Sequence, residues 1–155
     1  MSLYFFDISA LVKRYLIEPG SGWVISITDP GAGHAIYVGE ITQVEAAAAM
    51  AARHRAPGGI TLKERDDAVD LLGYHFINEY QPVAIGPLIL DQAIQLTQNY
   101  RLRGYDAVQL ATAIVTNTVL LAGGIGSLTF VTADSDLIIA GRAEGLLTDD
   151  PNLYP

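Results

Sequence analysis

Short apolar runs and helical patterns alternate along the whole chain. The apolar runs predict strands over residues 3–6, 34–38, 82–85 and 128–132, and a further edge strand in the tail after residue 145. Apolar residues at helical spacing predict helices over 8–17, 21–28, 40–55, 61–80, 87–99, 106–121 and 136–144. Strands that alternate with helices favour a parallel sheet covered on both faces. We therefore expect a single α/β domain over residues 1–155, built on a small parallel sheet.

Capping residues and small side chains add detail to some of these helices. Thr61 followed by Glu64 matches a capping box at the start of one helix, and Ser21 is the expected cap of another. The alanine-rich segment 46–52 predicts a helix that lies close to its neighbour, because its side chains are small.

Asp7 directly follows the first apolar run, which is typical of a strand buried on both faces. Aspartate is a preferred N-cap residue, so Asp7 has an ordinary role as the cap of the next helix. A carboxylate at the carboxyl end of a parallel strand also lies where open α/β sheets bind ligands. Which role matters more depends on what other side chains reach the same edge.

Further carboxylates are predicted at that edge of the sheet. Glu45 lies about one turn into the helix after the second strand, Asp106 opens the long helix, and Asp134 follows the fourth strand. Each aspartate has an alternative role as a helix cap, and Glu45 has one as a residue facing solvent. The neighbours of Glu45 and Asp106 are apolar, however, and burying a lone carboxylate costs several kcal/mol unless it is paired or binds a metal. We therefore expect these residues and Asp7 to form one acidic cluster.

A cluster of carboxylates without histidine or cysteine suits hard divalent cations, because these prefer oxygen ligands. Two such ions about 4 Å apart can activate a water and stabilise the leaving oxygen of a phosphodiester. The cluster therefore indicates metal-dependent phosphodiester hydrolysis.

Composition and charge narrow the class of protein. Nine Lys and Arg residues against 17 Asp and Glu residues give a net charge of −8, whereas broad nucleic-acid-binding surfaces are basic. A small acidic nuclease is still compatible with this charge, because bound cations reverse the local field. The absence of cysteine excludes a disulfide framework, a thiolate zinc site and a cysteine nucleophile. No signal-peptide pattern and no uninterrupted apolar stretch of about 20 residues is present, so we expect a cytoplasmic protein without a membrane span.

A set of short motifs follows in order along almost the whole chain. They are DISALVK over 7–13, EPGS over 18–21, Glu45 in its alanine-rich helix, LRGYDAVQLATA over 102–113, FVTADSDL over 130–137 and AEGL over 143–146. In this order they resemble the PIN-domain family, and specifically the VapC-like toxin ribonucleases of toxin–antitoxin pairs.

The resemblance implies a PIN-like α/β/α sandwich and cleavage of RNA with Mg²⁺ or Mn²⁺ as the cofactor. It carries the catalytic and metal-binding roles onto Asp7, Glu45, Asp106 and Asp134. Asp136 is expected to be a further ligand or a residue that supports the ligands without binding the metal. Ser9 and Thr132 match the hydroxyl positions that support the site. The resemblance also implies a homodimer and a cognate antitoxin protein that occupies the active-site groove.

Arg103 is the expected phosphate-binding residue, because it lies three positions before Asp106. For the other basic residues, such as Lys13 and Arg14, solvated helix ends are the simpler interpretation. No histidine has metal-ligand spacing, and His75 is expected to be structural.

Two other functions stay open at this stage. A PIN-like module without catalytic activity would bind RNA or a protein partner. A phosphate-accepting receiver domain would carry a lysine after a late strand, and no strand here is followed by one.

Overall fold

A five-stranded parallel sheet lies at the centre of the computed structural model, which describes all 155 residues. The strands are β1 (Leu3–Phe6), β2 (Ala35–Gly39), β3 (Gln81–Val83), β4 (Thr129–Val131) and β5 (Leu147–Asp149). Their order across the sheet is β3-β2-β1-β4-β5, so β1 is central, and every neighbouring pair is parallel. The predicted parallel sheet and its additional strand in the tail are therefore confirmed.

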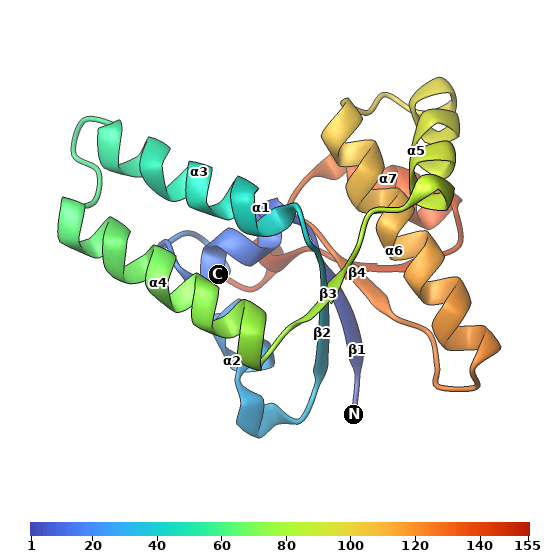
Figure 1. Cartoon of the computed structure of the whole chain (residues 1–155), viewed down its shortest axis with the longest axis horizontal. Coiled ribbons are helices and arrows are strands. Elements are labelled where there is room, and N and C mark those ends of the chain that lie inside the picture. Colours follow the sequence, from blue (N-terminus) through green and yellow to red (C-terminus); the bar gives the residue numbers. More distant parts are fainter.

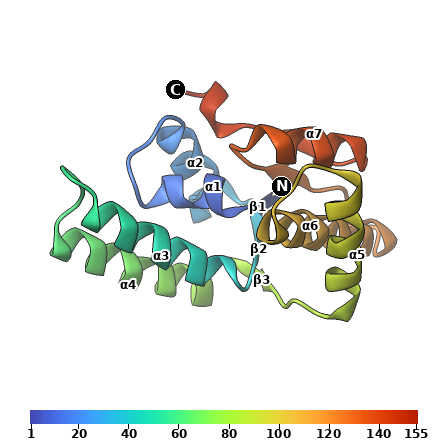
Figure 2. The same ribbon diagram turned by 90° about the horizontal axis from the view of Figure 1, so that it is seen from above.

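Helices cover both faces of the sheet (Figure 1). One face carries α1 (Ile8–Leu11), α2 (Ser21–Thr28), α3 (Thr42–Arg55) and α4 (Leu62–Asn78). The other carries α5 (Pro87–Asn99), α6 (Gly104–Ala122) and α7 (Ser135–Ala143). Three single-turn 3₁₀ helices complete the chain: η1 (Val12–Arg14), η2 (Pro30–Ala32) and η3 (Pro151–Leu153). In Figure 2, α3 and α4 lie side by side as a hairpin that extends away from the sheet.

The two faces have separate hydrophobic cores, because successive side chains of a strand point to opposite sides. Phe5 and Phe130 pack among α5, α6 and α7, whereas Phe6 and Val131 pack among α1 to α4. All four side chains are fully buried. This explains why the central strand β1 is continuously apolar instead of alternating.

The first helix differs from its prediction. A helix was expected over 8–17, but α1 ends at Leu11 and continues only as the 3₁₀ turn η1. Arg14 and Tyr15 then hydrogen-bond across to Tyr80 and His75, at and just beyond the end of α4. We attribute the early end of the helix to these tertiary contacts, which the local pattern does not contain.

The cap predicted at Ser21 is also wrong. Gly20 occupies the N-cap position in the left-handed region, with φ of 87°. The Ser21 hydroxyl accepts from the Glu18 N–H and donates to the Leu16 carbonyl, so it shapes the turn before α2. The capping box of Thr61 and Glu64 is confirmed at the start of α4.

The helix α6 is the one helix long and apolar enough to cross a membrane by length and composition. Its apolar side has another explanation, because Ala107, Leu110 and Ala111 are fully buried against Phe5 and Phe130. The helix is therefore a core element of the sandwich.

Candidate active site

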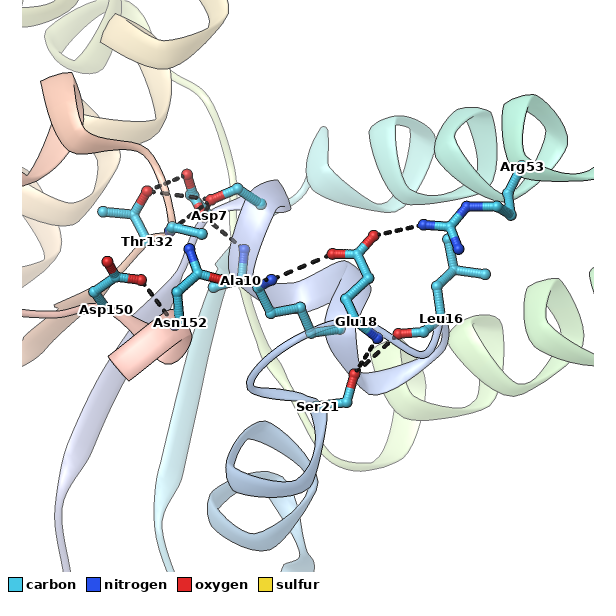
Figure 3. A network of polar contacts seen from close by, with 12 residues as sticks. Asp7, Ala10, Leu16, Glu18, Ser21, Arg53, Thr132, Asp150 and Asn152 are labelled. Carbon is cyan, nitrogen blue, oxygen red and sulfur yellow. Dashed lines mark hydrogen bonds and ion pairs between the residues drawn. The ribbon is translucent and has the colours of Figure 1, made fainter. Parts of the chain in front are cut away.

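Asp7 lies where the central strand β1 ends and α1 begins. Its Oδ1 accepts hydrogen bonds from the Ala10 N–H at 3.0 Å and from the Ser9 hydroxyl at 2.7 Å, and its Oδ2 accepts from the Thr132 hydroxyl at 2.7 Å (Figure 3). The side chain is only 2% exposed. Asp7 therefore caps α1, as one interpretation predicted, and at the same time it is a buried carboxylate at the sheet edge.

Burial raises the pKa of Asp7 from 3.8 to about 6. The hydrogen bonds from Thr132, Ser9 and Ala10 oppose this shift, and the negative charge of Asp106 adds to it. The hydrogen bonds therefore only partly compensate for the loss of water around this carboxylate.

Two hydroxyl groups connect the exits of β1 and β4. The Thr132 hydroxyl accepts from the Asp134 N–H at 3.1 Å, and the Ser9 hydroxyl accepts from the Ala133 N–H at 2.8 Å. The two hydroxyl oxygens lie 3.2 Å apart. Ser9 and Thr132 thus contact Asp7 directly and fix the loop that carries Asp134.

Asp134 caps α7 through one carboxylate oxygen. Its Oδ1 accepts from the backbone N–H groups of Asp136 and Leu137, at 2.8 and 3.1 Å. No hydrogen bond within the protein involves its Oδ2. Asp136 follows in the first turn of the same helix, with its side chain exposed.

Asp106 lies in the first turn of α6 and interacts electrostatically with the other acidic residues. Burial raises its pKa, and the charges of Asp134 and Asp136 raise it further, whereas Arg103 lowers it. The pKa of Glu45, in the first turn of α3, is raised by burial and by Asp106 and is lowered by a hydrogen bond from Gln109. The structure therefore brings the predicted acidic residues to one edge of the sheet, with Asp106 between them.

These acidic residues have no ion-pair partner. Salt bridges elsewhere involve Glu18, Asp66, Asp67 and Glu79, but none involves a member of the cluster. No group of three or more acidic or histidine side chains is arranged to hold a metal ion as it stands. The chemistry of the donors nevertheless fits a hard divalent cation, because all of them are carboxylates and none of them forms a salt bridge.

Two cavities meet at Asp106 and Arg103. One, of about 730 Å³, is lined by Glu45 and by apolar side chains that include Leu90 and Ile94. The other, of about 600 Å³, is mostly polar and is lined by Asp134 and Asp136. Arg103 is exposed and lines both cavities, so its guanidinium is accessible to an anionic ligand beside the acidic residues.

Lys13, Arg14 and Arg53 have partners within the fold. Lys13 is only 5% exposed and donates to Glu18 and Asn152, and Arg53 also binds Glu18 (Figure 3). The expectation that Lys13 lies at a solvated helix end is therefore wrong, because its ammonium group joins the tail to the first helices. His75 is structural, as predicted, since its Nδ1 lies 2.7 Å from the Tyr15 hydroxyl.

Gln109 is a residue of this region that the sequence analysis did not single out. Its side chain contacts both Glu45 and Thr42, across the gap between α6 and α3. The available signal was its position, three residues after Asp106 on a helix that is otherwise mainly apolar.

No protein-family model matches this sequence, and no curated protein matches it. Solved structures do match, each over 96% of this chain. A chain of a toxin–antitoxin complex from Klebsiella pneumoniae is 19% identical, with a TM-score of 0.61 over 97% of that chain. A chain of FitAB bound to an IR36 DNA fragment is 13% identical, with a TM-score of 0.63 over 94% of that chain. A chain of VapBC2 from Rickettsia felis, bound to a DNA fragment from their promoter, is also 13% identical, with a TM-score of 0.63 over 98% of its length.

These similarities cover nearly all of both chains, and at such identities they concern the fold. The PIN-like α/β/α sandwich predicted from the sequence is confirmed, since the chain has the fold of proteins in VapBC and FitAB complexes.

Proposed function

We propose that this protein is a divalent-metal-dependent endoribonuclease of the VapC type. The observation that carries the proposal is the group of acidic residues around Asp106, none of which has a salt bridge. Burial raises the pKa values of Asp7, Glu45 and Asp106, and the charges of neighbouring carboxylates add to each shift. A protein gains nothing in stability from gathering unpaired carboxylates, so their grouping is better explained by a bound cation.

In this proposal Asp7, Glu45, Asp106 and Asp134 hold Mg²⁺ or Mn²⁺, with Asp136 as a further ligand. When bound, such a cation supplies a Lewis acid for the phosphate and lowers the pKa of the attacking water. Ser9 and Thr132 orient the Asp7 carboxylate through their hydrogen bonds of 2.7 Å. The hydrolysis consumes one water and breaks one P–O bond of the RNA.

Arg103 is proposed to bind a phosphate of the RNA. Its side chain is exposed and lines both cavities next to Asp106. A guanidinium group can donate two parallel hydrogen bonds to phosphate oxygens, which orients the substrate. This positive charge is needed locally because the protein as a whole carries a net charge of −8.

We also propose that the protein is the toxin of a toxin–antitoxin pair and acts in the cytoplasm as a homodimer. Support comes from the shared fold, because the matching chains belong to toxin–antitoxin complexes. A cognate antitoxin would inhibit the enzyme by covering the cavities beside Asp106.

A second candidate is a PIN-like module that binds RNA or a protein without cleaving it. The observation that favours it is that no three acidic or histidine side chains are arranged to hold a metal ion as they stand. Only the nuclease should cleave RNA, and its cleavage should require both a divalent cation and the intact carboxylates.

The test is RNA cleavage in Mg²⁺ or Mn²⁺, with and without a chelator. We expect cleavage by the parent protein and a loss of about 100-fold or more in Asp7→Asn and Asp106→Asn, because each removes a carboxylate that is proposed to hold the cation. Asp70→Asn is the matched control, since Asp70 is an exposed aspartate of α4 outside the cluster. Cleavage that survives the chelator or both site substitutions would refute the metal-dependent site, whereas no cleavage by the parent protein would favour the non-catalytic module.

A further inference from the structure

Gln109 is a buried amide that joins the first turn of α3 to α6. The residue is only 2% exposed. Its Nε2 donates to the Thr42 hydroxyl and to Glu45 Oε1, each at 2.7 Å. Thr42 is itself fully buried, whereas Glu45 is partly exposed. The amide therefore reaches from the core to the one glutamate of the acidic cluster.

The other end of the same amide has no partner. Gln109 Oε1 is the single buried side-chain oxygen or nitrogen in the protein without a hydrogen bond. The backbone at Gly39, where β2 ends, lies beside it and supplies no donor. Buried polar atoms are nearly always paired, so an unpaired one calls for an explanation. An apolar side chain at this position would avoid the unsatisfied acceptor but would not donate to Glu45.

The orientation of the amide follows from its partners. A charged carboxylate only accepts hydrogen bonds, so the nitrogen of Gln109 faces Glu45 and the oxygen points away. Turning the amide round would place two oxygens against each other. The unpaired Oε1 is thus the consequence of directing both N–H groups toward α3.

Glu45 needs such a contact if it is to stay near Asp106. A glutamate side chain has several rotatable bonds, and the like charge of Asp106 favours rotamers that turn away into solvent. No salt bridge holds it in place. The hydrogen bond from Gln109 is the one side-chain contact that opposes this movement.

We propose that Gln109 is a positioning residue that keeps Glu45 directed toward Asp106, so that the carboxylate is ready to receive a divalent cation. This inference rests on the metal site of the proposed function. It assigns to Gln109 no contact with the cation or the RNA, and its effect passes through Glu45 alone.

The test is the affinity of the full-length protein for Mn²⁺, measured by titration calorimetry without RNA. Gln109→Met keeps the length and helix propensity of the side chain but removes its donors. We expect it to weaken Mn²⁺ binding about tenfold or more, as is typical when the group that orients a metal ligand is lost. Asp70→Asn, which removes an exposed charge of α4, is expected to bind like the parent.

A double-mutant cycle separates positioning from a general structural effect. In the Glu45→Gln background, Gln109→Met should change Mn²⁺ affinity no further, because its target is already gone. Equal weakening in both backgrounds, or no weakening in either, would overturn the inference. If Gln109→Met does not fold, Thr42→Val is compared with the double variant Thr42→Val/Gln109→Met. The double variant leaves no buried Thr42 hydroxyl without a hydrogen-bond partner.

Failure of the proposed function has a different signature. In that case the parent protein binds no Mn²⁺, or binds it equally well after Asp106→Asn. If the parent binds Mn²⁺ and Glu45→Gln weakens it, while Gln109→Met does not, the metal site stands and only the role of Gln109 is wrong.

Discussion

Asp7 combines two roles that the sequence presents as alternatives. It caps α1 through Ala10, and it is the most deeply buried carboxylate of the acidic cluster. A cap at a helix start is normally solvated and keeps an ordinary pKa, whereas the pKa of Asp7 is raised to about 6. A cap alone does not require this degree of burial.

This burial predicts how stability depends on pH in the metal-free protein. Asp7 titrates near 3.8 when unfolded and near 6 when folded, so the native state binds the proton more tightly. The free energy of unfolding therefore falls as pH rises from about 4 to about 6, because the charged form is costly to bury. The change in Asp7 pKa corresponds to a loss of about 3 kcal/mol above pH 6.

Asp7→Asn isolates this contribution, because asparagine is an equally good cap and has the same shape. Chemical denaturation in a chelator should show the variant equal to the parent near pH 4 and more stable by up to about 3 kcal/mol at pH 7. A variant that is less stable than the parent at pH 7 would show that Asp7 serves mainly as a structural group.

Sequence analysis identified the residues whose position in the fold is indicated by the residues next to them in the chain. Asp7 directly follows the apolar strand β1, and Asp134 lies three positions after the end of β4, so their place at the sheet edge could be predicted. Gln109 was missed because its partners Thr42 and Glu45 are 67 and 64 positions away in the chain. The position of Gln109 on a mainly apolar helix marks it as unusual, but a single sequence does not show which distant residues it contacts.

At the scale of elements, the least predictable segment is the connection into α2. Its N-cap is Gly20 rather than Ser21, because the carboxyl-terminal turn η3 packs against this position. A Cβ atom on Gly20 would lie 2.2 Å from the Pro151 carbonyl oxygen. Two further contacts hold the carboxyl-terminal tail in place. Asn152 accepts a hydrogen bond from Lys13, and Tyr154 stacks on Trp23 with ring centroids 4.4 Å apart. Such contacts between distant segments override local capping preferences.

Gly20→Ala should therefore destabilise the protein by about 2 kcal/mol or more, through both the left-handed backbone and the overlap with Pro151. Gly22→Ala is the matched control, since Gly22 lies within the same helix and has open space around its α-carbon. Alanine is the better helix former there, so this control should be neutral or stabilising by up to about 1 kcal/mol. Equal effects of the two substitutions in thermal melts would refute a specific contact between Gly20 and the tail.

At the scale of the whole molecule, alternation of strands and helices was enough to predict the sheet, its parallel direction and its helices on both faces. These features follow from repeated apolar patterns, in which many residues carry the same information. Helix ends and side-chain contacts depend on one or two residues each, and they account for the differences at α1 and α2.

The acidic residues around Asp106 predict that a divalent cation stabilises the native state. The net charge is −8, and the acidic residues near Asp106 contribute to it without forming any salt bridge. A cation that binds only the native state raises stability by about 2.7 kcal/mol at 100 times its dissociation constant. For a domain of this size that corresponds to an increase of about 5–10 °C in melting temperature.

Millimolar Mn²⁺ should therefore raise the melting temperature of the parent at pH 7, and the increase should be much smaller in Asp106→Asn. Asp70→Asn changes the net charge by the same amount but lies on α4, outside the cluster, so it should keep the full increase. This comparison separates site binding from general screening of an acidic protein, because screening would affect both variants alike. An equal increase in both variants would mean that the carboxylates around Asp106 do not form a cation site.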